Sequence, residues 1–153
     1  MDVADGVTMS MEGTILFVED SEDDREMMRF AFKKAGVHNP VHEVHNGDEA
    51  ISYLSGEGEY ADRERFPLPC LVITDLKMPG VDGFEFLEWL QDQPEFAKVP
   101  RLVLSNSLIE SDVTRAAALG ACAFFVKPGQ FDELIRTVAE MNEDWITEHC
   151  PLT

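Results

Sequence analysis

The chain has 153 residues and a mass of 17.2 kDa, which is the size of one ordinary domain with room for a hydrophobic core. Hydrophobic residues make up 44% of it, a share that excludes intrinsic disorder as its general state. Its 30 acidic residues outnumber its 12 basic ones and give a net charge of −18, so the phosphates of nucleic acids would repel it and we expect no nucleic-acid partner.

The first part of the chain divides into a tail and two strand–helix pairs. Residues 1–12 are acidic and lack the apolar core of a signal peptide, so we expect a flexible tail before a single domain. An apolar strand at 14–18 precedes a helix at about 22–35, which has apolar residues at helical spacing and ends at a glycine. A short mixed strand at 41–44 fits a sheet edge. Asn46 then caps a helix that runs to about residue 54.

A long polar segment, residues 55–70, follows this helix. Connections between a helix and a strand usually have two to six residues. We interpret the segment as an insertion on the surface. A loop that recognises a partner is the alternative.

The second part of the chain repeats the alternation. Asp82 is expected to cap the third helix, Ser107 to open the fourth with Glu110 in a capping box, and the fifth helix to follow Gly129. The strands between them lie at 71–74, 99–104 and 123–126. Alternating strands and helices predict a parallel sheet with helices on both faces. This domain is expected over 13–147, with a tail at 148–153.

The three cysteines, Cys70, Cys122 and Cys150, are far apart in sequence and odd in number. This usage fits a reducing compartment better than a disulfide framework, and the spacing matches no metal site. No apolar run of 18 residues is present, so we predict no membrane span and a cytoplasmic location.

Charged residues follow three of the predicted strands directly. Glu19 and Asp20 come after the first, Asp75 after the third and Lys127 after the fifth. Carboxyl ends of parallel strands share one edge of a sheet, which is the edge where ligands bind. Three clustered carboxylates repel one another. A divalent cation and the lysine would relieve that repulsion, and such a cluster suits the handling of a phosphoryl group.

The segments at these strand ends resemble the receiver domain of bacterial two-component response regulators. They read Val18-Glu19-Asp20-Ser21, Thr74-Asp75-Leu76-Lys77-Met78-Pro79-Gly80, Leu104-Ser105-Asn106-Ser107 and Phe125-Val126-Lys127-Pro128. The likeness runs from about Thr14 to Met141. The long loop ending in Pro67-Leu68-Pro69, together with Trp145, is similar to single-domain regulators that serve bacterial phytochromes and related kinases. The resemblance implies a flavodoxin-like (βα)5 fold with strand order 2-1-3-4-5.

The resemblance also implies roles for residues at the sheet edge. Asp75 would be the phosphoacceptor. Mg²⁺ would be held by Asp20 and Asp75, by Glu19 directly or through water, and by the backbone carbonyl of Lys77. Lys127 would pair with a phosphoryl oxygen.

Three further roles come from the same likeness. Ser105 would offer its hydroxyl to another phosphoryl oxygen, and Phe124 would change rotamer as the serine moves. A core position is the alternative for Phe124. A cis peptide between Lys127 and Pro128 would place the lysine.

The implied function is that of a stand-alone receiver and not an enzyme. A sensor histidine kinase would donate the phosphoryl group. The resemblance to phytochrome-type regulators implies a kinase of phytochrome type. The receiver would then signal by binding a downstream protein or by passing the phosphoryl group on. The alternatives are a binding module that needs no phosphorylation and a Mg²⁺-dependent phosphohydrolase. Such hydrolases usually carry an acid two residues after the nucleophile, where this chain has Lys77.

The last predicted helix suggests an interface. Its apolar stripe extends to Trp145 and Ile146, past the length that the sheet needs covered, so we expect both side chains to be exposed. Related receivers pair through the fourth helix, fifth strand and fifth helix, and we predict a homodimer through this face. The alternative is a helix that folds back on its own domain.

Overall fold

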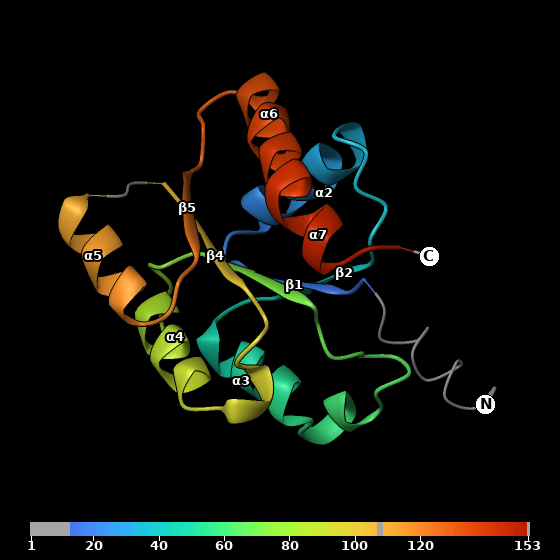
Figure 1. Ribbon diagram of the computed structural model, residues 1–153, viewed down its shortest axis with the longest axis vertical. Helices are drawn as coiled ribbons and strands as arrows, with labels where there is room; N and C mark the ends of the chain where they lie inside the picture. Colours follow the sequence, from blue (N-terminus) through green and yellow to red (C-terminus); the bar gives the residue numbers. More distant parts are fainter. Residues whose placement is uncertain (1–12, 107–108, 153) are drawn as a thin grey trace.

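The computed structural model describes residues 13–106 and 109–152, and the tail expected at 1–12 lies outside this range. Five parallel strands form one sheet in the order β2-β1-β3-β4-β5 (Figure 1). The predicted flavodoxin-like (βα)5 fold and strand order are therefore confirmed. The strands are β1 (Ile15–Val18), β2 (Val41–Val44), β3 (Leu71–Thr74), β4 (Arg101–Ser105) and β5 (Ala123–Val126).

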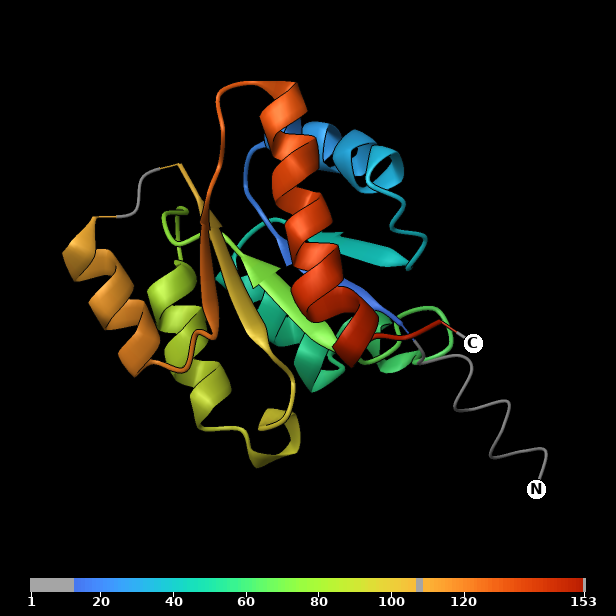
Figure 2. The ribbon, with the colours of Figure 1, turned by 45° about the horizontal axis from the view of Figure 1, so that its top comes forward.

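Helices cover both faces of this sheet (Figures 1 and 2). Alternate residues of the strands pack against α2 and α6 on one face and against α3, α4 and α5 on the other, because side chains alternate along a strand. The helices are α2 (Glu22–Lys34), α3 (Gly47–Ser55), α4 (Gly83–Gln91), α5 (Glu110–Ala118) and α6 (Phe131–Met141). Two 3₁₀ turns, η1 (Gly58–Ala61) and η2 (Pro94–Phe96), precede β3 and β4.

The strand register brings the charged residues to one edge. Val18 pairs with Thr74 across β1 and β3, and Ser105 pairs with Val126 across β4 and β5. The residues that follow each strand therefore leave the sheet on the same side. This is the geometric basis of the site described below.

Two of the predicted helix caps are present. Asn46 Oδ1 accepts a hydrogen bond of 2.9 Å from Glu49 N, and Asp82 forms a capping box with Glu85. The third differs from expectation. Helix α5 begins at Glu110 with Ile109 as its N-cap and no side-chain cap, while Ser107 lies outside the described residues.

The long segment before β3 packs against its own domain. The Arg63 guanidinium donates hydrogen bonds to the carbonyls of Tyr53 (2.8 Å) and Leu54 (2.9 Å) at the end of α3. The rings of Tyr60 and Phe66 pack on each other and on Tyr53. Arg63 therefore satisfies carbonyls that a helix end leaves unpaired.

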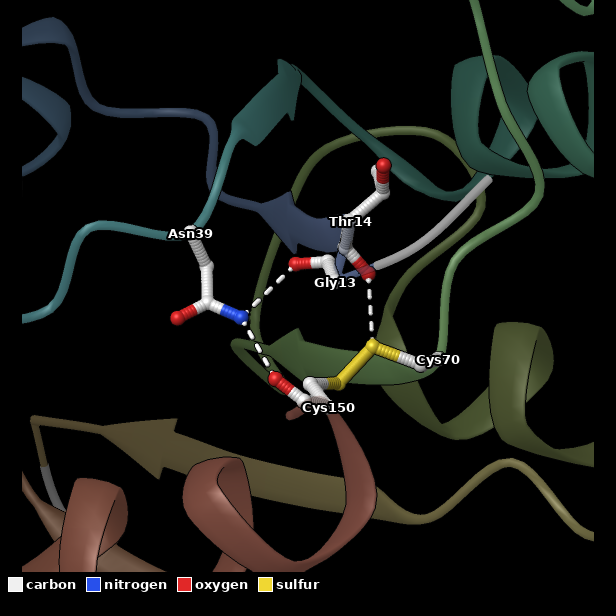
Figure 3. The surroundings of a disulfide bond; sticks show 5 residues. All are labelled: Gly13, Thr14, Asn39, Cys70 and Cys150. Carbon is white, nitrogen blue, oxygen red and sulfur yellow. Dashed lines mark hydrogen bonds between the residues drawn. A yellow bond between two sulfur atoms is a disulfide. The ribbon is translucent and has the colours of Figure 1, made fainter. Parts of the chain in front are cut away.

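A disulfide joins Cys70, just before β3, to Cys150, just after the last helix (Figure 3). The Cα atoms are 5.6 Å apart, within the usual range. Asn39 Nδ2 donates hydrogen bonds to the carbonyls of Cys150 and Gly13, each 2.9 Å long. The argument from the cysteines against a disulfide was wrong, because their 80-residue separation in sequence hides the return of the last helix to the amino end of β3. Cys122 is exposed and outside this bond.

The end of the last helix packs on its own domain. The helix continues from α6 through a π turn, η3 (Asn142–Ile146), into α7 (Thr147–His149). Ile146 is only 1% exposed, and Trp145 is half-buried and stacks on His149. The expected exposed patch was wrong and the alternative, a helix folded back, is confirmed. A π turn changes the angular position of these residues from that of an α-helix, and the disulfide holds the helix end down.

The homodimer prediction is no longer supported by this patch. It stays a prediction that rests on the resemblance alone. In the described part of the chain, none of the helices has the length and apolar character needed to cross a membrane.

Candidate functional site

Asp75 follows β3 directly, and its side chain is held at both oxygens. Oδ1 accepts hydrogen bonds from the backbone N–H groups of Leu76 (2.6 Å) and Lys77 (3.4 Å). Oδ2 accepts one from Nζ of Lys127 at 2.9 Å. The residue is 5% exposed. A buried carboxylate is tolerated here because backbone donors and an ammonium replace its water.

Glu19 and Asp20 join Asp75 in an acidic trio. Their carboxylate oxygens come within 4.8 Å of one another, because β1 and β3 are neighbours in the sheet. Glu19 is buried and Asp20 is exposed. The structure thus brings together the three acids that the sequence predicted as one site.

The surroundings of Glu19 change the ionisation of its carboxyl group. Burial raises its pKa to about 7, and the nearby negative charge of Asp75 acts in the same direction. The Lys127 ammonium opposes this rise in pKa without cancelling it. Near neutral pH, Glu19 is therefore divided between its protonated and charged forms.

Lys127 lies at the centre of the site. Its Nζ is 2.6 Å from Glu19 Oε1, 2.8 Å from Asp24 Oδ2 and 2.9 Å from Asp75 Oδ2. Burial alone would lower the pKa of Lys127, but hydrogen bonds to Asp24, Glu19 and Asp75 outweigh it and hold that pKa above its usual value. The ammonium is therefore charged.

The peptide between Lys127 and Pro128 is trans in this structure, so the expected cis bond was wrong. Trans is the commoner form even before proline. The lysine also has another anchor, because its backbone N–H donates a 2.8 Å hydrogen bond to the carbonyl of Ser105. The side chain reaches all three carboxylates from this position.

Asp24 is the site residue that sequence reasoning missed. It lies in the first turn of α2, where acids are common because they interact favourably with the helix dipole. An acid in the first turn of a helix gives no indication in sequence that it contacts a lysine 103 residues away. The one sequence feature that links Asp24 to the site is its spacing of four residues from Asp20.

The residues fit a divalent cation. Three carboxylates, those of Glu19, Asp24 and Asp75, contact the Lys127 ammonium. Asp20 lies beside Glu19 and Asp75 and adds a fourth carboxylate, which leaves an excess of negative charge. Glu19 Oε1 is buried, and the Lys127 ammonium that lies 2.6 Å from it is shared with two other carboxylates. An all-oxygen set of this kind is what Mg²⁺ prefers.

Ser105 and Phe124 lie on the neighbouring strands β4 and β5. Ser105 ends β4 and is 3% exposed. Phe124 is half-buried and packs against the apolar cluster that contains Leu76 and Phe84. Phe124 therefore lies at the edge of this apolar cluster and not in its buried centre. The rotamer change predicted for Phe124 stays a prediction.

Gly83 is needed where the chain returns beneath Asp75. Its N–H donates a 2.8 Å hydrogen bond to Leu76 O, and a Cβ here would overlap the Asp75 carbonyl and lie 2.6 Å from Leu76 Cα. We therefore expect Gly83→Ala to destabilise the fold by about 2 kcal/mol. Urea denaturation measures it. Gly129→Ala is the matched control, since its Cβ would meet nothing within 4 Å. Equal losses in the two variants would contradict the expectation.

The raised pKa of Glu19 also makes a prediction for metal binding. A protonated carboxylate must lose its proton before it binds a cation, so Mg²⁺ affinity should rise with pH until Glu19 is ionised, near its pKa of about 7. We expect Glu19→Gln to bind Mg²⁺ more weakly and with a flatter pH profile above pH 6. Titration calorimetry from pH 5.5 to 8.5 measures both. A variant that keeps the wild-type slope would show that another group titrates.

Comparison with known proteins identifies the family. Residues 15–139 match the model of the response regulator receiver domain, so the chain belongs to this family of signalling proteins rather than to a family of enzymes. It is similar to the probable methanogenesis regulatory protein FilR2 of Methanothrix harundinacea, with 31% identity covering 86% of this chain and 83% of FilR2.

Two single-domain phytochrome-type regulators are also similar. The crystal structure of the phosphorylated cyanobacterial phytochrome response regulator RcpA superimposes with a TM-score of 0.80, at 31% identity over 88% of this chain and 94% of RcpA. Response regulator Rcp1 of Synechocystis sp. is 29% identical over 86% of this chain and 88% of its own length. A manganese-bound structure of Rcp1 gives a TM-score of 0.77, at 28% identity over 87% of this chain and 94% of that structure.

Proposed function

We propose that Asp75 accepts a phosphoryl group from a phosphohistidine on a sensor histidine kinase, in a reaction that requires Mg²⁺. The observation that carries this proposal is the Asp75 carboxylate itself. It sits at the carboxyl edge of the sheet with one oxygen on a lysine ammonium and two further carboxylates beside it. The metal-bound Rcp1 structure and the phosphorylated RcpA structure support it by similarity.

The transfer step assigns a task to each side chain. An oxygen of Asp75 forms the new bond to phosphorus as the bond from phosphorus to the histidine nitrogen breaks. That nitrogen keeps the electron pair and takes a proton. A cation held by Glu19, Asp20, Asp75 and the Lys77 carbonyl would neutralise charge on the phosphoryl oxygens. Lys127 supplies a second, fixed positive charge to them.

The signal leaves the domain through neighbouring residues. The Ser105 hydroxyl binds a phosphoryl oxygen, and Phe124 follows it by repacking in the apolar cluster below. The partners are a phytochrome-type histidine kinase, named by similarity to RcpA, and a downstream protein that binds the phosphorylated domain or takes its phosphoryl group.

The two alternatives account less well for the site. A receiver that acts without phosphorylation does not require Lys127 to contact both Asp75 and Glu19. A phosphohydrolase would need an acid at the position of Lys77, whose ammonium instead pairs with Asp112 at 3.4 Å.

Intact mass spectrometry tests the proposal. The wild-type chain is incubated with phosphoramidate, once with Mg²⁺ and once with a chelator. We expect one added phosphoryl group per chain with the metal and none with the chelator. A wild type that gains no phosphoryl group with Mg²⁺ would refute the function.

A further inference from the structure

The contact between Asp24 and Lys127 is not explained by the phosphoacceptor scheme. Asp24 lies on α2, outside the acidic trio of Glu19, Asp20 and Asp75. Its Oδ2 nevertheless accepts a 2.8 Å hydrogen bond from the Lys127 ammonium. The lysine side chain is 9% exposed and that of Asp24 is 35% exposed, so Asp24 meets the buried ammonium from its solvent side.

The lysine has no N–H left for another acceptor. An ammonium carries three donors, and the three carboxylates of Glu19, Asp24 and Asp75 lie 2.6 to 2.9 Å from Nζ. A phosphoryl oxygen on Asp75 must therefore replace one of these acceptors. The natural candidate is Asp75 Oδ2, because it belongs to the carboxylate that is converted into the acyl phosphate.

The backbone of Asp24 is held at the start of α2. Its backbone N–H donates a 3.2 Å hydrogen bond to Oγ of Ser21, the N-cap of α2. The backbone N–H of Ser21 in turn donates a 3.1 Å hydrogen bond to Glu19 Oε2. The two carboxylates that flank the ammonium are thus joined through the start of α2.

We propose that Asp24 is a positioning residue for Lys127, an inference that rests on the proposed phosphoacceptor function. Asp24 and Glu19 hold two donors of the ammonium, so the third points at Asp75 and at the phosphoryl oxygen that arrives there. Without Asp24, the flexible four-carbon stem of the lysine has one fixed partner fewer on its solvent side. Loss of Asp24 should therefore slow phosphoryl transfer, because a misplaced Lys127 ammonium stabilises the charge on the phosphoryl oxygens less well.

The test compares phosphorylation rates among three variants at saturating Mg²⁺, with phosphoramidate as the donor. We expect Asp24→Ala to react about fivefold more slowly than wild type. Asp24→Asn keeps an acceptor oxygen and should recover most of the rate. Asp23→Ala is the matched control, because it also removes an acid from the first turn of α2 and should stay within about twofold. An Asp24→Ala rate equal to that of Asp23→Ala would overturn the inference.

A second comparison shows whether Asp24 acts through the lysine. In a Lys127→Ala background, Asp24→Ala should cause no further loss. If Asp24→Ala still slows the reaction fivefold in the Lys127→Ala background, Asp24 acts through the structure of α2 and not through the lysine, and the inference is overturned. If that background reacts too slowly to measure, the ¹⁵N resonance of the Lys127 ammonium replaces it. It should shift in Asp24→Ala and not in Asp23→Ala, and an unchanged resonance would again overturn the inference. A wild type that gains no phosphoryl group would refute the proposed function instead.

Discussion

Asp75→Asn should abolish phosphorylation of the metal-loaded protein and leave it folded. The amide is nearly isosteric and its oxygen can still accept the hydrogen bond from Leu76 N–H, which is 2.6 Å long in the native site. It has no negative charge with which to attack phosphorus. Lys127 retains Glu19 and Asp24 as partners, so the ammonium stays paired. Intact mass after incubation with phosphoramidate and Mg²⁺ should show no added phosphoryl group.

Asp20→Asn is the matched control for this experiment. It removes one acid from the same trio but not the proposed nucleophile. We expect it to weaken Mg²⁺ binding and still to gain the phosphoryl mass when Mg²⁺ is raised. Thermal melting should confirm that both variants are folded. If the folded Asp75→Asn protein gains the phosphoryl mass, another residue is the acceptor.

The sequence was sufficient for the arrangement of the sheet and the central residues of the site. Short, mostly apolar strands that alternate with helices favour a parallel sheet with helices on both faces. Their carboxyl ends must then meet, which places Glu19, Asp75 and Lys127 together without any structure. Helix caps such as Asn46 were also predictable, because an N-cap involves only residues three positions apart.

Contacts between distant segments were not predictable in this way. Asp24 has the sequence context of an ordinary first-turn acid, and only the path of the chain after β5 brings Lys127 to it. The course of the last helix depends on a π turn, which apolar spacing alone does not indicate, so Ile146 was expected on the wrong side. Because the course of the last helix was not predicted, the proximity of Cys150 to Cys70 was not predicted either.

The disulfide should contribute about 4.5 kcal/mol to the free energy of unfolding. This figure is the loop-closure entropy that a cross-link removes from the unfolded chain when its ends are 80 residues apart. The bond joins Cys70 to Cys150 and so holds the last helix against the start of β3. We therefore expect urea denaturation of the reduced protein, and of Cys150→Ser, to show this loss. Cys122→Ser is the control, because this exposed thiol lies outside the bond.

The same variants should leave the chemistry of the site intact. Cys70 precedes β3 and Asp75 follows it, so the disulfide and the acids lie at opposite ends of one strand. Phosphorylation rates at a temperature where the reduced protein is still folded should therefore match those of the oxidised protein. Counting thiols by alkylation under denaturing, non-reducing conditions gives the direct check. One reactive thiol per chain is expected, whereas three would show that the bond does not form in solution.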